Sequence, residues 1–338
     1  MPVRVAVDAM GGDHAPRAIV RGALAALADD ERLELILVGD ESIVRGELES
    51  AGVAYNKDRV RVFHASQVVG MDEAPVDALR NKKDSSIARM CDLAVQGDAH
   101  AVLSAGNTGA CAAAAQFKLK PLRCVTRPGI AVTIPSFHGP FVLCDVGANI
   151  QAKPQHLYEY AVMASVFAER VIGIKNPRVA LISIGEESGK GTGLVKQTHE
   201  RLIKDSSVNY VGNAEGRELF EDRCDVAICD GFVGNIVLKF VEGLAEGLFK
   251  TIAHEFNDDS PELKEKFTGA LDRVWRRHDY SQYGGAPLLG IDGVCIICHG
   301  RSSEFAIRNA VRVARTYVDA NINEALTSRL GGLVPTGA

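Results

Sequence analysis

The residues best placed to do chemistry lie between Ala101 and Ala115, in the sequence AVLSAGNTGACAAAA. A short apolar run opens this stretch, a small polar loop from Ser104 to Gly109 follows, and an alanine tract of high helix propensity closes it. The pattern predicts a strand, a tight loop and a helix that Thr108 can cap. The free N–H groups of such a helix start bind anions, phosphate above all, although a glycine turn here can also serve packing alone.

A second candidate anion site is Arg301, in the run HGRSSE that starts the last long predicted helix. A guanidinium at a helix start adds a bidentate clamp that suits phosphate. The alternative is a surface ion pair between Arg301 and Glu304. Lys82 and Lys83, beside a serine pair, make a further candidate phosphate or carboxylate site, which a solvated helix cap explains equally well.

Candidate acid–base groups follow the first predicted strand, Val3 to Asp8, in the glycine-rich corner from Ala9 to Pro16. Asp8, Asp13 and His14 can be catalytic or can brace this loop through hydrogen bonds, and bracing is the favoured interpretation for Asp8. The corner is not the GxGxxG dinucleotide fingerprint, and no acidic residue closes a following strand at the right distance. A nicotinamide enzyme is therefore disfavoured.

The elements that must position these residues alternate between strand and helix, and their apolar runs are nearly continuous. Such runs are typical of a parallel sheet covered on both faces. Small-residue corners follow three more predicted strands and carry Asn149, Lys190 and Asn235. Because open α/β sheets bind ligands at the carboxyl ends of their strands, we expect several of these corners to converge on one pocket. Further strands are predicted at 33–38, 60–64, 129–134, 141–145, 178–184, 208–212, 225–229 and 294–298.

The stretch from Asn235 to Trp275 has the apolar spacing of two amphipathic helices, which predicts a helical hairpin. Its second arm ends in a basic cluster around the only tryptophan. Such a pair can seal a dimer, touch an anionic membrane surface or cover the core. The acidic Glu242 and Glu246 favour core or dimer packing. The cluster consists of Arg273, Trp275, Arg276, Arg277 and His278.

Composition bounds the class of protein. The 338 residues carry a formal net charge of −5, which argues against a general nucleic-acid binder. The first residues lack the features of a signal peptide, and no uncharged apolar run approaches the about 18 residues of a membrane span, so we expect a cytoplasmic protein. Most of the eight cysteines lie in apolar runs, as in a reducing compartment. Cys295 and Cys298 would point to opposite faces of a strand, which argues against a metal site or disulfide between them.

Seven short motifs follow one another along the chain: VDAMGGDHAP at 7–16, SAGNTG at 104–109, DVGAN at 145–149, GEE with KG within 185–191, DGFVGN at 230–235, YGGAPLLG at 283–290 and HGRS at 299–302. This ordered set resembles the bacterial phosphate acyltransferase (PlsX) family, and the match covers nearly the whole chain. That family makes acyl phosphate from acyl-[acyl carrier protein] and inorganic phosphate for phospholipid synthesis.

The resemblance implies a three-layer α/β/α fold with a mainly parallel sheet, like that of isopropylmalate dehydrogenase and phosphate acetyltransferase. It implies one domain over 1–338, with a protruding helical hairpin at about 235–278. It further implies a homodimer at the inner face of the cell membrane, with a membrane glycerol-3-phosphate acyltransferase as a candidate partner and no cofactor. In this sequence the hairpin tip, Asn257 to Pro261, is acidic, so attraction through Arg273, Arg276 and Arg277 is favoured over insertion.

The resemblance also implies a mechanism in which phosphate is the nucleophile and no metal is required. We expect the loop at Gly106, Asn107, Thr108 and Gly109 and the Arg301 guanidinium to bind phosphate, supported by Ser302 and by Lys82 or Lys83. His299 or His14 would donate a proton or a hydrogen bond to the departing sulfur. Asn149 and Asn235 would bind the carbonyl oxyanion or the pantetheine amides. The acidic carrier protein would dock on the Arg273 to Arg277 cluster, or on Lys118, Lys120 and Arg123. Two alternatives stay open: a phosphate acetyltransferase that uses coenzyme A, and a non-catalytic membrane-side adaptor.

Overall fold

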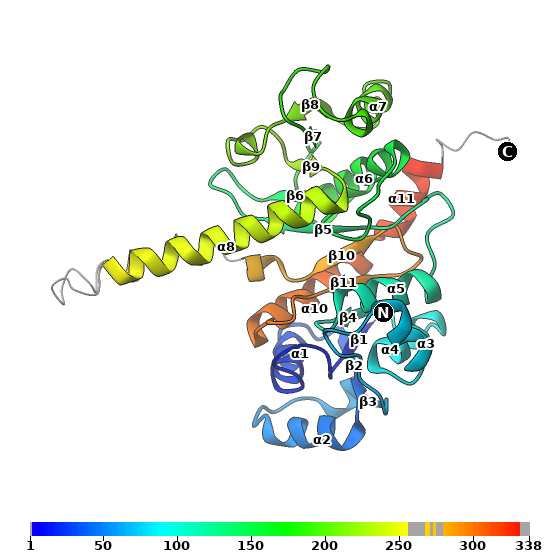
Figure 1. Ribbon diagram of the computed structural model, residues 1–338. Helices are drawn as coiled ribbons and strands as arrows, with labels where there is room; N and C mark the ends of the chain where they lie inside the picture. The colour runs from blue at the N-terminus through cyan, green and yellow to red at the C-terminus, as the bar shows by residue number, and fades with distance from the viewer. Residues whose placement is uncertain (1, 256–267, 271–272, 275–279, 332–338) are drawn as a thin grey trace.

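The computed structural model describes residues 2–255, 268–270, 273–274 and 280–331. Within them, one eleven-stranded sheet runs through the molecule in the order β3-β2-β1-β4-β11-β10-β5-β6-β9-β7-β8 (Figure 1). The strands are β1 (Val3–Asp8), β2 (Leu33–Gly39), β3 (Val60–His64), β4 (Ala101–Ser104), β5 (Gly129–Ile134), β6 (Phe141–Cys144), β7 (Val179–Ile182), β8 (Tyr210–Ala214), β9 (Val226–Ile228), β10 (Ala286–Leu289) and β11 (Cys295–Ile297).

Helices cover both faces of the sheet, as the nearly continuous apolar runs predict. In β1, for example, Val5 and Val7 belong to the core on one face and Ala6 to the core on the other. The three-layer α/β/α architecture is therefore confirmed. The helices are α1 (Arg17–Asp29), α2 (Glu41–Ser50), α3 (Pro75–Asn81), α4 (Ser86–Val95), α5 (Thr108–Lys118), α6 (Pro154–Phe167), α7 (Gly193–Leu202), α8 (Gly231–Glu255), α10 (Glu304–Asp319) and α11 (Ile322–Gly331).

Strand direction reverses in the middle of the sheet. Strands β1 to β4 and β11 are parallel to one another, and so are β6, β7, β8 and β9. Three successive antiparallel pairings, β11 with β10, β10 with β5 and β5 with β6, separate the two sets. The carboxyl ends of the two sets therefore point toward opposite edges of the sheet, so the corners that follow these strands do not all lie at one edge.

Helix α8 projects away from the sheet and is the most prominent feature of the outline (Figure 1). It is the first arm of the predicted hairpin and starts at Gly231, earlier than the sequence pattern suggests. Most of the predicted second arm, including the tip at Asn257 to Pro261 and the residues Trp275, Arg276 and Arg277, lies outside the described residues. None of the helices in the described ranges is long and apolar enough to cross a bilayer.

Candidate active site

A buried carboxylate joins the carboxyl ends of β1 and β4. Ser104 Oγ donates to Asp8 Oδ2 at 2.7 Å and accepts from the Gly106 N–H at 3.0 Å, while Asp8 Oδ1 accepts from the Met10 N–H at 3.1 Å. Burial raises the pKa of the Asp8 carboxyl. A Cβ on Gly11 would lie 2.7 Å from the Gly106 nitrogen, so the two loops touch through glycine. Asp8 thus braces the corner, as expected.

Asn107, and not Thr108, caps α5. Its Oδ1 accepts from the Ala110 N–H at 2.9 Å, the position an N-cap asparagine normally bonds. Its Nδ2 lies 3.0–3.2 Å from the carbonyl oxygens of Gly70, Met71 and Glu73, so the whole side-chain amide holds the corner together. The prediction that Thr108 is the cap is wrong, because Thr108 is already the first helical residue and Asn107, with φ −59° and ψ 111°, occupies the cap position before it.

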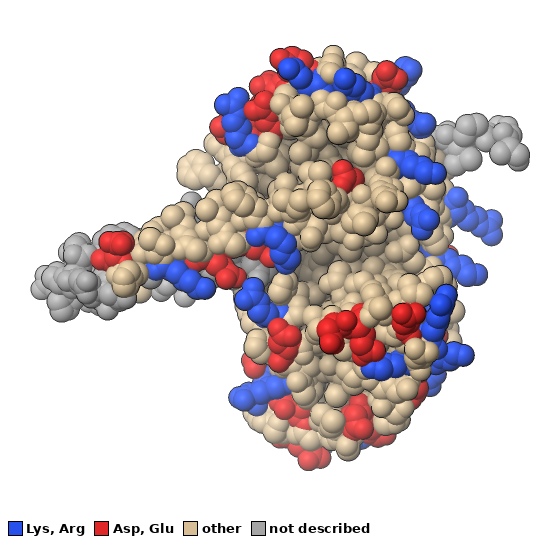
Figure 2. Space-filling view, viewed as in Figure 1, with Lys and Arg blue, Asp and Glu red and all other residues tan. Residues whose placement is uncertain are grey.

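Thr108 and Gly109 form the exposed first turn of α5. The first N–H groups of a helix have no acceptor within it, and they carry the positive end of its dipole. Both residues line a cavity of about 500 Å³, which also contacts the first turn of α8 and the loop at 146–150. Figure 2 shows the surface hollowed between the two halves of the molecule. The first turn of α5 therefore presents anion-binding groups to an open cavity.

The opposite wall of the cavity is built on Asp145. Its carboxylate accepts from the N–H groups of Ile130, Gly147 and Ala148 at 3.0–3.2 Å and from that of Asn149 at 2.7 Å. Burial raises the pKa of Asp145 although these four donors oppose the shift. The carboxylate thereby fixes the loop that lines the cavity.

The first turn of α8 packs directly on this loop through Gly234. A Cβ on Gly234 would lie 1.9 Å from the Asp145 carbonyl oxygen, a contact that no side chain can make. The Gly231 N–H donates to the Asn149 carbonyl at 2.9 Å. The DVGAN and DGFVGN motifs are therefore two halves of one packed unit.

The two predicted oxyanion asparagines differ in their surroundings. Asn235 is exposed and lines the cavity. Asn149 donates from Nδ2 to the Pro128 carbonyl and to the Tyr160 hydroxyl, both at 2.7 Å, and it does not line the cavity. The geometry thus brings Asn235 together with Thr108 and Gly109, whereas the Asn149 side chain supports the loop from behind.

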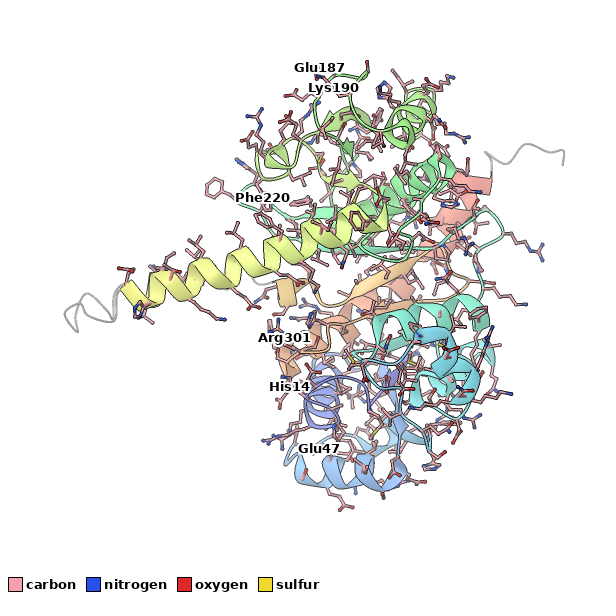
Figure 3. All side chains as sticks on the ribbon, in the orientation of Figure 1. His14, Glu47, Glu187, Lys190, Phe220 and Arg301 are labelled. Carbon is pink, nitrogen blue, oxygen red and sulfur yellow. The ribbon has the colours of Figure 1, made fainter. Side chains whose placement is uncertain are left out.

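His299 and Arg301 lie at the carboxyl end of β11, against the first glycine-rich corner. The Asp13 N–H donates to the Gly300 carbonyl at 2.8 Å, and Figure 3 shows His14 and Arg301 on the same side of the molecule. The Arg301 N–H donates to His299 Nδ1 at 3.1 Å, so the neutral ring carries its proton on Nε2. Burial, followed by the Lys239 cation, lowers the pKa of His299.

Arg301 reaches α8 instead of its own helix. Its guanidinium lies 3.6 Å from the Glu246 carboxylate, so the alternative that pairs it with Glu304 names the wrong partner. Ser302 is buried, and its N–H donates to the His299 carbonyl at 2.9 Å. Neither Arg301 nor His299 lines the cavity.

Lys82 and Lys83, which precede α4, have different surroundings. Lys82 Nζ donates to the Val68 carbonyl at 2.8 Å and forms an ion pair with Glu73, whose pKa its hydrogen bond lowers. Lys82 therefore braces the segment that receives the Asn107 amide, while Lys83 is exposed. Neither lysine lines the cavity.

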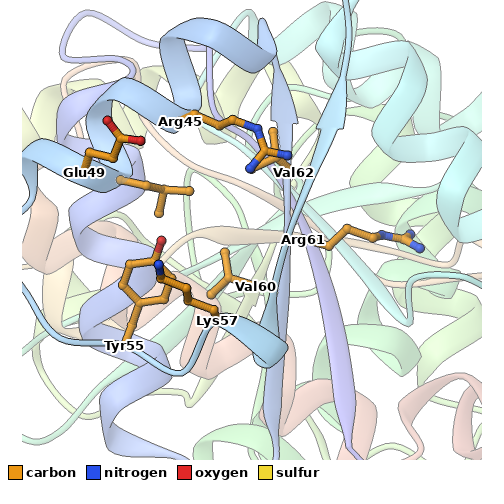
Figure 4. Close-up of a pocket in the computed structure, with 8 residues that line it drawn as sticks. Arg45, Glu49, Tyr55, Lys57, Val60, Arg61 and Val62 are labelled. Atoms are coloured by element: carbon orange, nitrogen blue, oxygen red, sulfur yellow. The ribbon is translucent and has the colours of Figure 1, made fainter.

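Two other regions stand apart from this site. The corner that carries Glu187 and Lys190 lies at the far end of the molecule, beyond β7 (Figure 3), and no residue of 185–191 lines the cavity, so this corner does not converge with the others. Another cavity, of about 370 Å³, lies between α2 and the edge strand β3 (Figure 4). Its Arg45 and Arg61 pair with Glu41 and Asp98, and it contains none of the predicted site residues.

In the described part of the chain, no three or more His, Cys, Asp or Glu side chains are grouped so that they can hold a metal ion. Cys295 and Cys298 belong to the cores on opposite faces of the sheet, as predicted. Cys295 Sγ lies 3.7 Å from Cys111 Sγ of α5.

Sequence reasoning missed the apolar wall of the cavity. Ile150 and Phe232 line it, and both are large side chains that follow small-residue motifs. A signal was present for Phe232, since it starts a run of exposed apolar residues at every fourth position of α8. That run comprises Phe232, Ile236, Phe240, Leu244 and Leu248.

Comparisons with known proteins agree with this architecture. Two solved phosphotransacetylases share the fold: one from Streptococcus pyogenes has a TM-score of 0.61 and 16% identity and covers 93% of this chain and 94% of its own, and EutD from Staphylococcus aureus has a TM-score of 0.60 and 13% identity and covers 94% of both. A protein named phosphate acyltransferase from Heliobacterium modesticaldum is 46% identical over 98% of this chain and 99% of its own length.

A second phosphate acyltransferase, from Halothermothrix orenii, is 44% identical over 95% of this chain and 96% of its own length. The model of the family described as "Fatty acid synthesis protein" matches residues 3–325. Relatedness of this extent, over nearly the full length of both chains, places the protein within one family. The chain belongs to the fatty acid synthesis protein family, that of the phosphate acyltransferases.

Proposed function

We propose that this enzyme joins inorganic phosphate to the acyl group of acyl-[acyl carrier protein], releasing acyl phosphate and free carrier protein for phospholipid synthesis. A phosphate oxygen attacks the thioester carbonyl, a C–O bond forms, the C–S bond breaks, and the sulfur leaves as a thiolate that takes up a proton. One observation carries the proposal beyond family membership: the exposed first turn of α5 opens into the same cavity as Asn235 and an apolar wall.

The residues divide the work as follows. The Thr108 and Gly109 N–H groups bind phosphate at the positive end of the α5 dipole. Asn235 donates to the carbonyl oxygen as negative charge develops there. His299 is the candidate donor to the departing sulfur because its neutral ring carries an Nε2 proton, and His14 is the alternative. A thiol pKa of about 8.5 makes the thiolate a tolerable leaving group even with weak assistance.

Arg301 is proposed to bind phosphate only after its contact with Glu246 opens. The pair is loose, at 3.6 Å, and its side chains are 63% and 36% exposed, so separating it costs little. A guanidinium bound to a phosphate gains a stronger, bidentate contact. Ser302, Lys82 and Lys83 would act as supports for this corner.

Helix α8 supports two proposals about assembly. The part of its exposed apolar run beyond the cavity, Ile236 to Leu248, projects from the body on a helix that also carries Glu242 and Glu246. A homodimer would bury this run, and we place dimerisation before membrane contact because acidic residues disfavour a membrane-facing helix. We further propose a single domain and a cytoplasmic location with peripheral attachment to the inner face of the cell membrane, with a membrane glycerol-3-phosphate acyltransferase as a candidate partner.

The acidic carrier protein needs a basic docking surface. Lys118 is partly used, since its Nζ lies 2.5 Å from the Asp92 carboxylate. Lys120 and Arg123 are exposed near the end of α5, and Arg273 is exposed as well. We propose that the carrier protein docks at one of these two surfaces.

The test is phosphate-dependent formation of acyl phosphate from a long-chain acyl carrier protein, compared with acetyl-coenzyme A. We expect turnover with the carrier-protein substrate, and Arg301→Ala should raise the KM for phosphate about tenfold or more, as expected when a charge-assisted contact is lost. Faster turnover of acetyl-coenzyme A would indicate a phosphate acetyltransferase. Absence of thiol release at saturating phosphate would indicate a non-catalytic adaptor.

A further inference from the structure

The cavity beside α5 is lined by polar groups and by apolar side chains in comparable measure. Thr108, Gly109 and Asn235 supply its polar groups near the helix starts. Ala112 and Ala113 continue the wall along α5, and Ile130 of β5 also lines the cavity. A substrate with a polar reacting end and an apolar remainder would match this division.

Two large apolar side chains at this cavity are exposed to water. Ile150 is 66% exposed and Phe232 is 60% exposed, and both line the cavity. Exposed apolar area of this size costs free energy that an apolar ligand would recover on binding. Their exposure leaves apolar surface in this cavity available to a ligand.

The backbone that carries Phe232 and Ile150 is fixed by close packing and hydrogen bonds. Phe232 lies between Gly231 and Gly234, which pack against the Asn149 carbonyl and the Asp145 carbonyl. Ile150 follows Asn149, whose side chain is anchored to Pro128 and Tyr160. A wall fixed in this way can discriminate between ligands of different size.

The size and charge of the cavity narrow the ligand further. Its volume of about 500 Å³ lies within the usual range for small-molecule sites. From Thr108 to Gln116 it follows α5 for roughly 12 Å. Among the described residues that line it, none carries a formal charge, so beyond the anion-binding start of α5 the cavity suits an uncharged part of a ligand.

We infer that this cavity holds the part of the acyl chain next to the thioester, with the carbonyl at Thr108 and the methylenes extending along α5 toward Gln116. Phe232 and Ile150 form its outer wall and determine which chain lengths are accepted. The inference rests on the proposed function and adds the acyl subsite and its specificity residues.

The experiment measures kcat/KM for a series of acyl carrier proteins that bear short, medium and long saturated chains. We expect Phe232→Ala to lower the value for the longest chain by about tenfold, the effect of removing roughly two methylenes from apolar contact. The loss should shrink as the chain shortens. Phe117→Ala is the matched control, because Phe117 is 68% exposed on α5, another helix beside the cavity, and does not line the cavity.

A second variant fills the space instead of enlarging it. Ala113→Leu places a larger side chain on the half-buried α5 wall and should exclude long chains more strongly than short ones, with thermal unfolding measured to verify the fold. Equal losses at every chain length in both variants, or no loss in either, would overturn the acyl subsite while leaving the proposed function intact. A wild-type enzyme that uses none of the chains would remove the proposed function, and this inference with it.

Discussion

Asp8 and Asp145 occupy similar places in the two halves of the sheet, yet they organise different kinds of corner. Both are buried carboxylates that follow or end a strand, and burial raises the pKa of each. Asp8 accepts from the Ser104 hydroxyl and the Met10 N–H, among others, and ties two strands together. Asp145 receives four backbone N–H groups and shapes a loop. At the Asp8 corner, the loops that follow β1 and β4 pack against each other. At the Asp145 corner, the loop exposes small residues to the cavity.

The largest effect is expected at the contact between α8 and the Asp145 corner. Gly234→Ala forces a Cβ to within 1.9 Å of the Asp145 carbonyl oxygen, so the helix start must move, at a cost of about 3 kcal/mol in the free energy of unfolding. Urea denaturation measures this cost. Gly243→Ala is the control on the same helix, because a Cβ there meets nothing within 4 Å and should stabilise α8 by about 0.5–1 kcal/mol. Equal effects at the two positions would contradict the close packing at Gly234.

The comparison itself is tested by replacing each carboxylate with its amide. Asp145→Asn directs an NH₂ group at backbone donors that need acceptors, and should cost about 2–3 kcal/mol of unfolding free energy. Asp8→Asn should cost about 1 kcal/mol, because the Ser104 hydroxyl can rotate and exchange donor for acceptor roles. Chemical denaturation of both variants decides the order. A larger cost at Asp8 would show that the two corners are not organised as described.

The start of α5 depends on both the oxygen and the nitrogen of the Asn107 side-chain amide. Asn107→Ala removes the helix cap and three contacts to the 70–73 segment, which should cost about 1–2 kcal/mol and lower kcat/KM for phosphate. Asn107→Asp keeps the cap acceptor and loses the donors, so its helix should be retained while the segment loosens. Denaturation together with steady-state kinetics separates the two effects. Unchanged values in both variants would remove Asn107 from the site.

The smallest effect concerns pH. Because the folded pKa of Asp145 is raised, the native state binds more protons than the unfolded state, and the stabilisation present at acid pH is lost as the pH rises through the folded pKa. The stability difference between wild type and Asp145→Asn should therefore widen as the pH falls toward the ordinary aspartate pKa. Glu73 supplies the opposite sign, because the hydrogen bond from Lys82 lowers its pKa, and the difference from Glu73→Gln should narrow over the same range. Unfolding free energies of both variants and of the wild type should be measured across this range. If the two differences change in the same direction, the pKa shift assigned to Asp145 or to Glu73 is wrong.

Local patterns predicted much of this molecule. The glycine-rich turns after β1, β4, β6 and β9 were located from small residues that follow apolar runs, and the structure has corners at each. Bracing by Asp8 was likewise predictable from a carboxylate at the end of a strand. Strand β10 was not predicted, because its neighbours read as turn residues and its sequence contains Pro287.

The convergence of the corners was predicted only in part. Thr108, Gly109 and Asn235 share a cavity, and the corner at Lys190 lies elsewhere. Strand direction does not decide which corners meet, because the Asn235 and Lys190 corners follow β9 and β7, two parallel neighbours, while the Thr108 corner follows β4 of the oppositely directed set. The Lys190 corner follows the strand that is farther from β4 in the sheet order. Asn149 donates to the Pro128 carbonyl and Lys82 forms an ion pair with Glu73, and residue type alone does not reveal either contact.

The amino-acid sequence by itself determined where strands give way to helices, because backbone propensity, apolar spacing and glycine content act over a few neighbouring residues. Only the tertiary structure decided which corners meet and which polar groups stay available to a substrate. Those outcomes depend on pairing between distant segments, such as Asp8 with Ser104, 96 positions away, and Asn107 with the 70–73 segment. Whether a polar side chain is hydrogen-bonded within the protein or left available to a substrate depends on which distant segment the fold packs beside it.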